Sequence, residues 1–380
     1  LMLRYSFGMD DAADELALFM GVQDPEAAAA AAKIEAPKNG IKFLWNYAGN
    51  CITNQHGDVN RVFETLSDEK KCEFIVVCDT FMTDSAKYAD ILLPDAMRAE
   101  QLNMSTNGYS EYYWGVTVGG PAQEPPFEFR PIDDVHAEIA DRFGMKDKFT
   151  AGKTQDEWVR SLYETGAAED PEMPSWDQIL EQGVWKRELP TAIAFEKNVA
   201  DPVGNPWKTP SGKIEIYSEA LEKIASEREL SEGQVISPIP IFDPGVEGYG
   251  AVTSEYPLYM SGWHDKARTH SSFGALEVLR DYNRHRLWIN PIDAEPRKIN
   301  DGDMVRVKSP AGEVQVEAHV TSRIVPSVIA MPQGFWHEAN MEGDKLDTGG
   351  VINTLTTYTP SPLAHGNGPS NSIIAEVRKV

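Results

Sequence analysis

Basic side chains are scarce in this sequence. Its 380 residues include 35 lysines and arginines against 59 aspartates and glutamates, which gives a formal net charge of −24 at pH 7. Proteins that bind the nucleic-acid backbone do so through clustered lysine and arginine. The charge balance therefore argues against a nucleic-acid partner, and it says nothing about the fold.

Cysteine is scarcer still. The cysteines are Cys51, Cys72 and Cys78, and no two of them form a CxxC pair. A zinc site of the common cysteine type and a disulfide framework both need paired or closely spaced cysteines, so neither is expected. We predict that the three side chains are buried free thiols.

Long apolar runs and several common catalytic motifs are also absent. No apolar stretch approaches the roughly 18 residues of a membrane-spanning helix, so an integral membrane protein is not expected. The opening residues LMLRYSFGMDDAADEL lack the layout of a signal peptide. The sequence has no GxGxxG, Walker, HExxH or nucleophile-elbow motif. It therefore gives no support for an NAD enzyme, an ATPase, a zinc protease or a hydrolase.

The stretch FIVVCDTFMTDSAKYADILLP, residues 74–94, places a short polar segment between two apolar runs. Residues 74–77 are typical of a strand buried on both faces, and residues 91–93 of a second strand, with a short helix between them. A strand at 41–47 and a helix that begins near Asp58 are expected before them. This alternation predicts an α/β fold in which helices cover parallel strands.

Helices and irregular covering structure are expected in the middle of the chain. The segment PIDDVHAEIADRFG places Ile132, Val135, Ile139 and Phe143 on one helical face. The other expectations are a linker at 23–40, a helix at 155–164 and irregular structure at 165–205.

The character of the sequence changes after residue 256, where short strand patterns end in turns or prolines. In DMVRVKSPAGEVQVEAHV, Val314, Val316 and Ala318 alternate with polar residues, which predicts a hairpin. RLWINP and RIVPSVIAMP are typical of further strands, and a short helix is expected near 273–281. We therefore predict a compact β-barrel domain from about residue 256 to residue 380.

Polar residues gather where two of the predicted parallel strands end, and open parallel sheets bind ligands at that edge. In WNYAGNCITNQHGD, amide and imidazole side chains stand beside glycines that let backbone amides approach an anion. Asp79 follows the next strand and suits a ribose diol or the N–H edge of guanine, while Thr83 or Asp84 could cap the short helix behind it. These residues favour a nucleotide site, although polar turns after strands are also ordinary loop chemistry.

Two loops of the predicted barrel offer similar groups. HDKARTHSSFG places Arg268, Thr269, His270 and Ser271 ahead of a glycine, and such side chains bind phosphate or carbonyl oxygens. GGVINTLT places two glycines before Asn353, a pattern typical of a loop that approaches a ligand closely. The alternative for both is a surface loop whose polar groups bond within the protein.

Six blocks of the sequence carry a resemblance to a known family. They are WNYAGNCITNQHGDVNR, VVCDTFMTDSAKYADILLPD, TPSGKIEIYS, ARTHSSFG, LWINPIDAEPRKINDGDMVRV and GGVINTLTTYTPSPLAHGN. In this order, within about residues 38–380, they resemble the C-terminal half of the catalytic subunit of dimethyl sulfoxide reductase. That subunit belongs to the bis-molybdopterin guanine dinucleotide oxidoreductases.

The resemblance implies a partial, Rossmann-like parallel-sheet α/β domain at residues 1–255 and a double-psi-like β-barrel domain at residues 256–380. In this family the two domains clamp two pterin guanine dinucleotides that hold one molybdenum. The residues that match nucleotide-binding positions of the family's α/β domain are Asn46, Gly49, Asn50, His56, Asp79 and Thr83. Those that match barrel positions facing the pterin and its phosphates are His270, Ser271 and Asn353. Arg268 and Thr269 stand beside them in the sequence, and Asn290 and Asp293 match a further family block.

Two features of the family are not found in this sequence. The cysteine-rich motif for a 4Fe–4S cluster and the segment that supplies the serine ligand to molybdenum both belong to the family's N-terminal half. We therefore assign no catalytic residue and no metal ligand here, and we expect that this chain does not complete the active site alone. Full reductase activity with bound molybdenum in the purified chain would contradict that expectation.

The resemblance implies a reductase that removes an oxygen atom from dimethyl sulfoxide or a related S- or N-oxide. Its expected partners are the oxide substrate, the N-terminal half of the same subunit, an iron–sulfur electron-transfer subunit and a membrane anchor, and its expected location is the periplasm. Two alternatives stay open. One is a relative with another substrate, such as selenate, formate or an aromatic hydroxyl, and the other is a non-catalytic module for cofactor binding or assembly.

Overall fold

The structure is a computed structural model that describes residues 41–106, 113–230, 232–248, 250–282, 284–359, 361–363 and 371–380. These residues form two compact units, one made of 41–92 with 216–380 and the other of 93–215. The division differs from the boundary between residues 255 and 256 that the sequence suggests, and that boundary stays a prediction. The linker expected at 23–40 lies outside the described residues.

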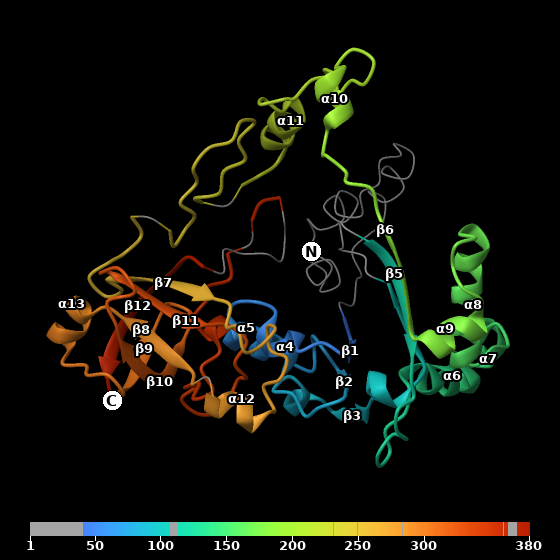
Figure 1. Ribbon diagram of the computed structural model, residues 1–380. Coiled ribbons are helices and arrows are strands. Elements are labelled where there is room, and N and C mark those ends of the chain that lie inside the picture. The colour runs from blue at the N-terminus through green and yellow to red at the C-terminus, as the bar shows by residue number, and fades with distance from the viewer. Residues whose placement is uncertain are drawn as a thin grey trace. The chain divides into compact units, whose positions relative to one another are not determined.

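The first unit begins with a three-stranded sheet, coloured blue in Figure 1. Its strands lie in the order β1 (Phe43–Tyr47), β2 (Phe74–Asp79) and β3 (Ile91–Pro94). β1 and β2 are parallel, with Tyr47 opposite Cys78, so their carboxyl ends meet at one edge. The connecting helices are α4 (Cys51–Asn54), α5 (Val59–Leu66) and η1 (Ala86–Tyr88). The predicted start of α5 is confirmed, because the Asp58 side chain accepts the backbone N–H of Arg61.

Burial in this sheet differs from the prediction at one residue. Ile75, Val76 and Val77 are buried as expected, but Phe74 is 37% exposed. Phe74 opens the strand, and its ring stacks on that of Phe43 at a centroid distance of 5.9 Å instead of entering the core. The cysteines are free thiols, of which Cys72 and Cys78 are buried and Cys51 is partly buried.

A closed six-stranded barrel forms the other large part of this unit (Figure 1). Its strand order is β10-β8-β11-β7-β12-β9. The predicted hairpin is confirmed, since β9 and β10 pair antiparallel and the Ser309 N–H donates to the Gly312 carbonyl across the turn. The strands are β7 (Leu258–Trp263), β8 (Arg286–Ile289), β9 (Met304–Lys308), β10 (Glu313–Val320), β11 (Val328–Pro332) and β12 (Ile373–Lys379).

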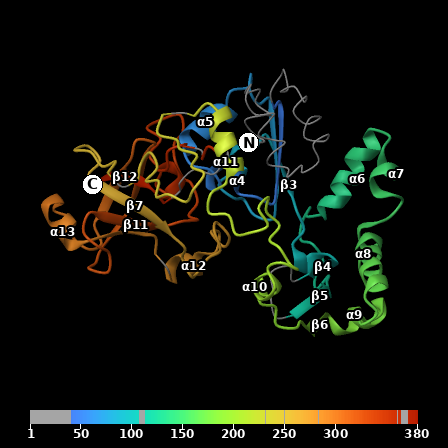
Figure 2. The same cartoon turned by 90° about the horizontal axis from the view of Figure 1, so that it is seen from above.

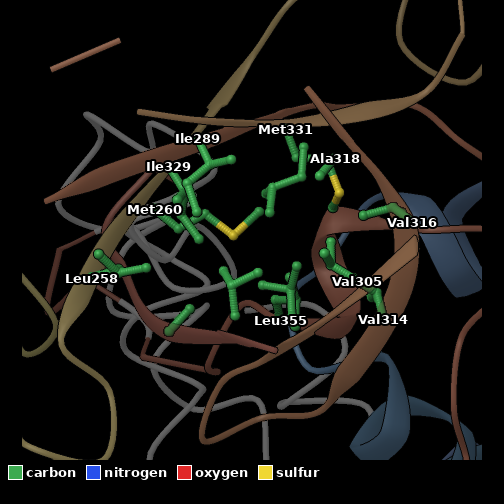
Figure 3. Close-up of a cluster of buried hydrophobic side chains, with 14 of the residues drawn as sticks. Leu258, Met260, Ile289, Val305, Val314, Val316, Ala318, Ile329, Met331 and Leu355 are labelled. Carbon is green, nitrogen blue, oxygen red and sulfur yellow. The ribbon is translucent and has the colours of Figure 1, made fainter. Parts of the chain in front are cut away.

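The inside of the barrel is one apolar core. Figure 3 shows Met260, Ile289, Ile329, Met331 and Leu355 pointing toward one another from strands β7, β8 and β11 and from the segment after residue 354. Each of these five side chains is at most 1% exposed. Side chains of this size contribute about 1.5–3 kcal/mol each to folding when fully buried.

Short helices complete the first unit. The helix predicted at 273–281 corresponds to α12 (Glu277–Tyr282). The others are α11 (Glu219–Glu227), α13 (Pro291–Ala294), η3 (Glu295–Arg297) and η4 (Ile352–Thr354). A mixed α/β part with parallel strands and a closed barrel are therefore both confirmed, whereas the Rossmann-like and double-psi-like topologies stay predictions.

The second unit is an antiparallel sheet with helices on one face. Tyr163 from α8 and Ile179 from α9 pack on Val116 and Val118 of the central strand. Figure 2 shows these two helices beside β5 and β6. The strands are β4 (Asn103–Thr106), β5 (Tyr113–Gly119) and β6 (Val184–Glu188). The helices are η2 (Arg98–Glu100), α6 (Ile132–Arg142), α7 (Lys146–Thr150), α8 (Gln155–Glu169), α9 (Trp176–Gln182) and α10 (Glu196–Ala200).

The expectation of irregular structure at 165–205 is wrong. α8 runs on to Glu169, and α9, β6 and α10 follow it. A capping box starts α9: the Ser175 hydroxyl accepts the Gln178 N–H, and the Gln178 side chain accepts the Ser175 N–H. β6 is a strand because it pairs with β5, which local sequence does not reveal. In the described ranges no helix is long and apolar enough to cross a membrane.

Candidate functional site

The loop after β1 is closed by Asn46. Its side chain is 5% exposed, donates from Nδ2 to the Gly49 carbonyl at 2.7 Å and accepts the Cys51 thiol at 2.7 Å. The Ala48 N–H donates to the Cys78 carbonyl, which ties the loop to the end of β2. The space beside Gly49 is open, since a Cβ there would meet no atom closer than 3.5 Å, and its part in the turn is the carbonyl that Asn46 binds. The predicted residues Asn46 and Gly49 therefore shape one turn at the sheet edge.

Asn50 connects this loop to the segment behind β2. Its Oδ1 accepts the Ser85 N–H at 3.2 Å and the Thr53 hydroxyl at 3.3 Å. Its Nδ2 is buried without a hydrogen-bond partner in the described part of the chain. His56 is half-buried in the next turn. An inward amide with an unused N–H is a donor that a bound acceptor could satisfy.

Asp79 stands at the carboxyl end of β2, as predicted. Its Oδ1 accepts the Thr80 N–H at 2.7 Å, and no residue in the described ranges donates a hydrogen bond to its Oδ2. Ser85 is the N-cap of η1, and the Thr83 hydroxyl accepts the N–H of its first residue, Ala86, at 3.2 Å. One carboxylate oxygen of Asp79 is thus available to a ligand at the sheet edge.

Arg268, His270 and Ser271 all contact the segment that follows β11, residues 333–338. The Arg268 guanidinium lies 3.7 Å from the Phe335 ring centroid and donates to the Gly334 carbonyl at 2.9 Å. His270 Nδ1 bonds the Gln333 amide at 3.0 Å. The Trp336 indole N–H donates to the Ser271 carbonyl at 2.9 Å, while Thr269 is exposed.

Asn353 lies in η4, on a loop that Asp347 organises. Asp347 is fully buried and accepts five hydrogen bonds. Its Oδ1 takes the backbone N–H groups of Glu338, Gly349 and Gly350 at 2.9–3.1 Å. Its Oδ2 takes the Val351 N–H at 2.7 Å and the Thr354 hydroxyl at 3.0 Å.

Residues 333–338 therefore join the separate clusters. At the α/β side, Asp84 Oδ2 accepts the His337 N–H at 2.5 Å, and the Tyr88 hydroxyl bonds His337 Nδ1 at 3.1 Å. At the other side, Glu338 bonds Asp347. Residues 333–338 thus bond directly to Asp84, to the 268–271 loop and to Asp347. Asp84 in turn bonds residues 53–54, and Asp347 bonds residues 349–354. These bonds connect the four predicted clusters within one unit, and their joint role in holding a ligand stays a prediction.

The Asn290 and Asp293 side chains hydrogen-bond to residues of the barrel outside 333–338. Asn290 caps α13 by accepting the Ile292 N–H at 2.9 Å and donates to the Ile324 carbonyl at 2.6 Å. Asp293 accepts the Ser327 N–H at 2.8 Å. Both side chains stabilise the barrel itself, and their assignment to the cofactor stays a prediction.

Burial keeps two histidines of this site neutral. Burial lowers the pKa of His337 against the raising influence of Asp347 and Asp84. Burial also lowers the pKa of His285 from 6.5 to about 3. The His285 ring stacks on the Phe335 ring with a centroid distance of 3.5 Å. Its Nε2 donates to the Gly350 carbonyl at 2.8 Å. Burial, with Asp84 and Asp347 nearby, raises the pKa of Tyr88 to about 12.

His285 makes stability depend on pH in a defined direction. Below pH 6.5 the His285 imidazole binds a proton in the unfolded chain, whereas in the folded chain it stays neutral down to about pH 3. The free energy of unfolding should therefore fall by about 1.4 kcal/mol per pH unit from this group as pH drops through that window. Urea denaturation at pH 7, 6 and 5 should show a shallower fall for His285→Gln, whose amide can still donate to Gly350. Equal slopes would contradict the assignment.

Several residues of this site carry little sequence signal. Asp347 precedes Gly349-Gly350, and an aspartate two residues before glycine is a recognisable turn pattern. Asp84, by contrast, meets His337 from 253 positions away, and no local pattern shows that contact. No group of three or more His, Cys, Asp or Glu side chains that could hold a metal ion occurs within the described ranges.

Two family models match the chain. The Molydopterin dinucleotide binding domain matches residues 258–372, which begin with β7 of the barrel, and Molybdopterin oxidoreductase matches residues 8–142. Together the two models include all four predicted clusters and residues 333–338.

The chain is also similar to reductases of known name. It is 48% identical over 353 residues to the putative dimethyl sulfoxide reductase chain YnfE of Escherichia coli, covering 92% of this chain and 43% of that protein. It is 45% identical to dimethyl sulfoxide reductase DmsA of E. coli, over 92% of this chain and 42% of that protein. The chain thus spans about two fifths of the length of these relatives.

The fold has a match among solved structures. Acetylene hydratase from Pelobacter acetylenicus aligns with a TM-score of 0.67 and 19% identity, over 90% of this chain and 44% of that one. At that identity the likeness concerns the fold alone. The matching models and relatives nevertheless agree with the resemblance found in the six blocks, and the chain belongs to the molybdopterin oxidoreductase family, with dimethyl sulfoxide reductases among its relatives.

Proposed function

We propose that this chain is the cofactor-binding part of a molybdenum bis-(molybdopterin guanine dinucleotide) reductase that removes an oxygen atom from dimethyl sulfoxide or a related S- or N-oxide. The observation that carries the proposal is the bonding of residues 333–338 to Asp84, to the 268–271 loop and to Asp347, because the two aspartates also bond the predicted segments at 50–54 and 349–354. The 45–48% identity to dimethyl sulfoxide reductase chains supports the substrate class.

The residues present fit a long ligand with a purine at one end and phosphates along its length. Asn50 offers a buried, unused amide N–H, and Asp79 offers an unused carboxylate oxygen to N–H groups of guanine. On the barrel side, Arg268 supplies a positive charge and His270 and Ser271 stand beside it. This distribution suits a guanine at the sheet edge and anionic oxygens toward the barrel.

When bound, the cofactor supplies the oxygen-atom and two-electron chemistry. The chain's own residues would then bind and orient it. Asp79 would select the base, the Asn50 amide would hold an acceptor, and Arg268, fixed over Phe335, would hold negative charge without needing to reorganise. None of these roles needs a proton transfer from this part of the chain.

Changing Asp79 to asparagine should weaken guanine nucleotide binding. Asp79→Asn is expected to lower the affinity for guanosine diphosphate by about tenfold to a hundredfold, because a hydrogen bond to a charged acceptor contributes about 1.5–3 kcal/mol. Calorimetric titration of the full chain measures this, with Asp68→Asn as the control at a carboxylate of the same unit that lies outside the four clusters.

Two nucleotide analogues separate base recognition from ribose recognition. Inosine diphosphate lacks the exocyclic amino group of guanine, and 2′-deoxyguanosine diphosphate lacks one ribose hydroxyl. If Asp79 binds the base, its substitution should abolish the preference for guanosine over inosine and leave the ribose preference unchanged. No detectable binding of guanosine diphosphate to the unaltered chain would contradict the proposed function.

The same proposal extends to the wider assembly and the finer topology. It includes a Rossmann-like sheet, a double-psi-like barrel, and a 4Fe–4S cluster held by an N-terminal half of the subunit. It also includes an iron–sulfur electron-transfer subunit, a membrane anchor and a place in the periplasm. The names of the relatives, DmsA among them, support this assembly by resemblance. Co-purification of the full-length subunit with an iron–sulfur protein would test it.

A further inference from the structure

Two buried aspartates of this unit each accept a backbone N–H from one of two consecutive residues. Asp84 and Asp347 are both 0% exposed. Asp84 accepts the N–H of His337, and Asp347 accepts the N–H of Glu338. Neither carboxylate has a lysine or arginine among its hydrogen-bond partners in the described residues. Hydrogen bonds from neutral groups therefore hold both side chains.

Each carboxylate also binds one of the two loops that flank this peptide. Asp84 Oδ2 accepts the Thr53 hydroxyl at 2.7 Å and the Asn54 amide at 2.8 Å, so it holds residues 50–54, the amide loop, which includes the short helix α4. Asp347 accepts three N–H groups of residues 349–351 and the Thr354 hydroxyl, so it holds the loop that carries Asn353.

We propose that Asp84 and Asp347 act together as positioning residues that fix the amide loop at 50–54 relative to the glycine loop at 349–354 through the His337–Glu338 peptides. The inference rests on the proposed function for its consequence in ligand binding. The linkage between the two loops itself does not depend on a ligand. Charge-assisted bonds of this kind are short and strong, which suits a fixed spacing between loops.

The two aspartates should differ in how they tolerate an amide. Only Oδ2 of Asp84 accepts hydrogen bonds, and Oδ1 is buried without a partner in the described structure. An asparagine at 84 can keep all three bonds by placing its oxygen at the Oδ2 position. Both oxygens of Asp347 accept N–H or O–H groups, so an asparagine at 347 must turn an N–H₂ toward other donors.

Hydrogen exchange of the full chain without ligand tests the linkage. Asp84→Ala and Asp347→Asn should each speed exchange by about tenfold or more at both loops, because the loss of one hydrogen bond of this type is worth about that factor. Asp84→Asn should leave residues 349–351 protected. Glu100→Gln, a buried carboxylate change in the other unit, should alter neither loop. Faster exchange confined to each variant's own loop would overturn the proposal.

Titration with guanosine diphosphate tests the consequence. Each of Asp84→Ala and Asp347→Asn should weaken binding by about tenfold, and the double variant should bind no more weakly than the weaker single variant, because each change breaks the same linkage. Losses that multiply in the double variant would overturn the joint role. If the unaltered chain does not bind the nucleotide, the proposed function fails while the exchange experiment still decides the linkage.

Discussion

Replacing Gly334 by alanine is expected to destabilise the barrel unit by about 4 kcal/mol or more, an effect at the upper end for single substitutions. Gly334 has φ +87°, and a Cβ there would lie 1.9 Å from the carbonyl oxygen of His270. Backbone atoms cannot yield as a flexible side chain would. Either the 268–271 loop or residues 333–338 must therefore move.

Gly302 provides the matched control for this substitution. It lies in the same barrel with φ +86°, but its nearest neighbour is the Glu317 carboxylate oxygen at 4.0 Å. Gly302→Ala should cost only the left-handed backbone strain, about 1–2 kcal/mol. Urea denaturation of both variants gives the difference, and equal losses would show that His270 does not pack against residue 334.

Truncating Leu355 to alanine should cost about 3 kcal/mol of unfolding free energy. Leu355 is fully buried in the barrel core, where Figure 3 places it among the inward-pointing side chains. Leucine-to-alanine changes in such cores lose the transfer free energy and leave a cavity. Because Leu355 follows η4 directly, the change should also loosen Asn353, which exchange at residues 351–354 would report.

Ile292 is the control for the loss of an apolar side chain in the same unit. It is 66% exposed on α13. Ile292→Ala should change the unfolding free energy by no more than about 0.5 kcal/mol. A loss at Leu355 as small as this would mean that the barrel interior relaxes around the cavity or is not packed as described.

Some elements follow from local sequence because a local physical cause dominates there. β2 is an apolar run up to Cys78 that ends in Asp79, and β10 alternates valine and alanine with polar residues, so the pattern of burial predicts both strands. The turn between β9 and β10 follows from its proline and glycine. The start of α5 follows from Asp58, whose side chain can accept an N–H of the first turn.

Other elements depend on partners far along the chain. β6 has four exposed residues among five, and it is a strand because β5 lies beside it. Phe74 belongs to an apolar run but lies at the edge of the core, where it stacks on Phe43. No pattern within the run separates it from its buried neighbours.

The site divides in the same way. Asn50, Asp79, His270 and Asn353 could be proposed from their places after strands or beside glycines, and the structure brings their loops together. The segment at 333–338 that joins them could not be predicted. Its contacts to residues 84, 268–271 and 347 form only when the barrel and the sheet pack within one unit.

The proposed function requires that these loops form one binding surface for a guanine-bearing, phosphate-bearing ligand. Hydrogen exchange of the full chain with and without saturating guanosine diphosphate tests it most directly. Exchange at 46–57, 79–85 and 333–338 should slow together when the nucleotide binds. Unchanged exchange at all three, or slowing confined to one of them, would contradict it.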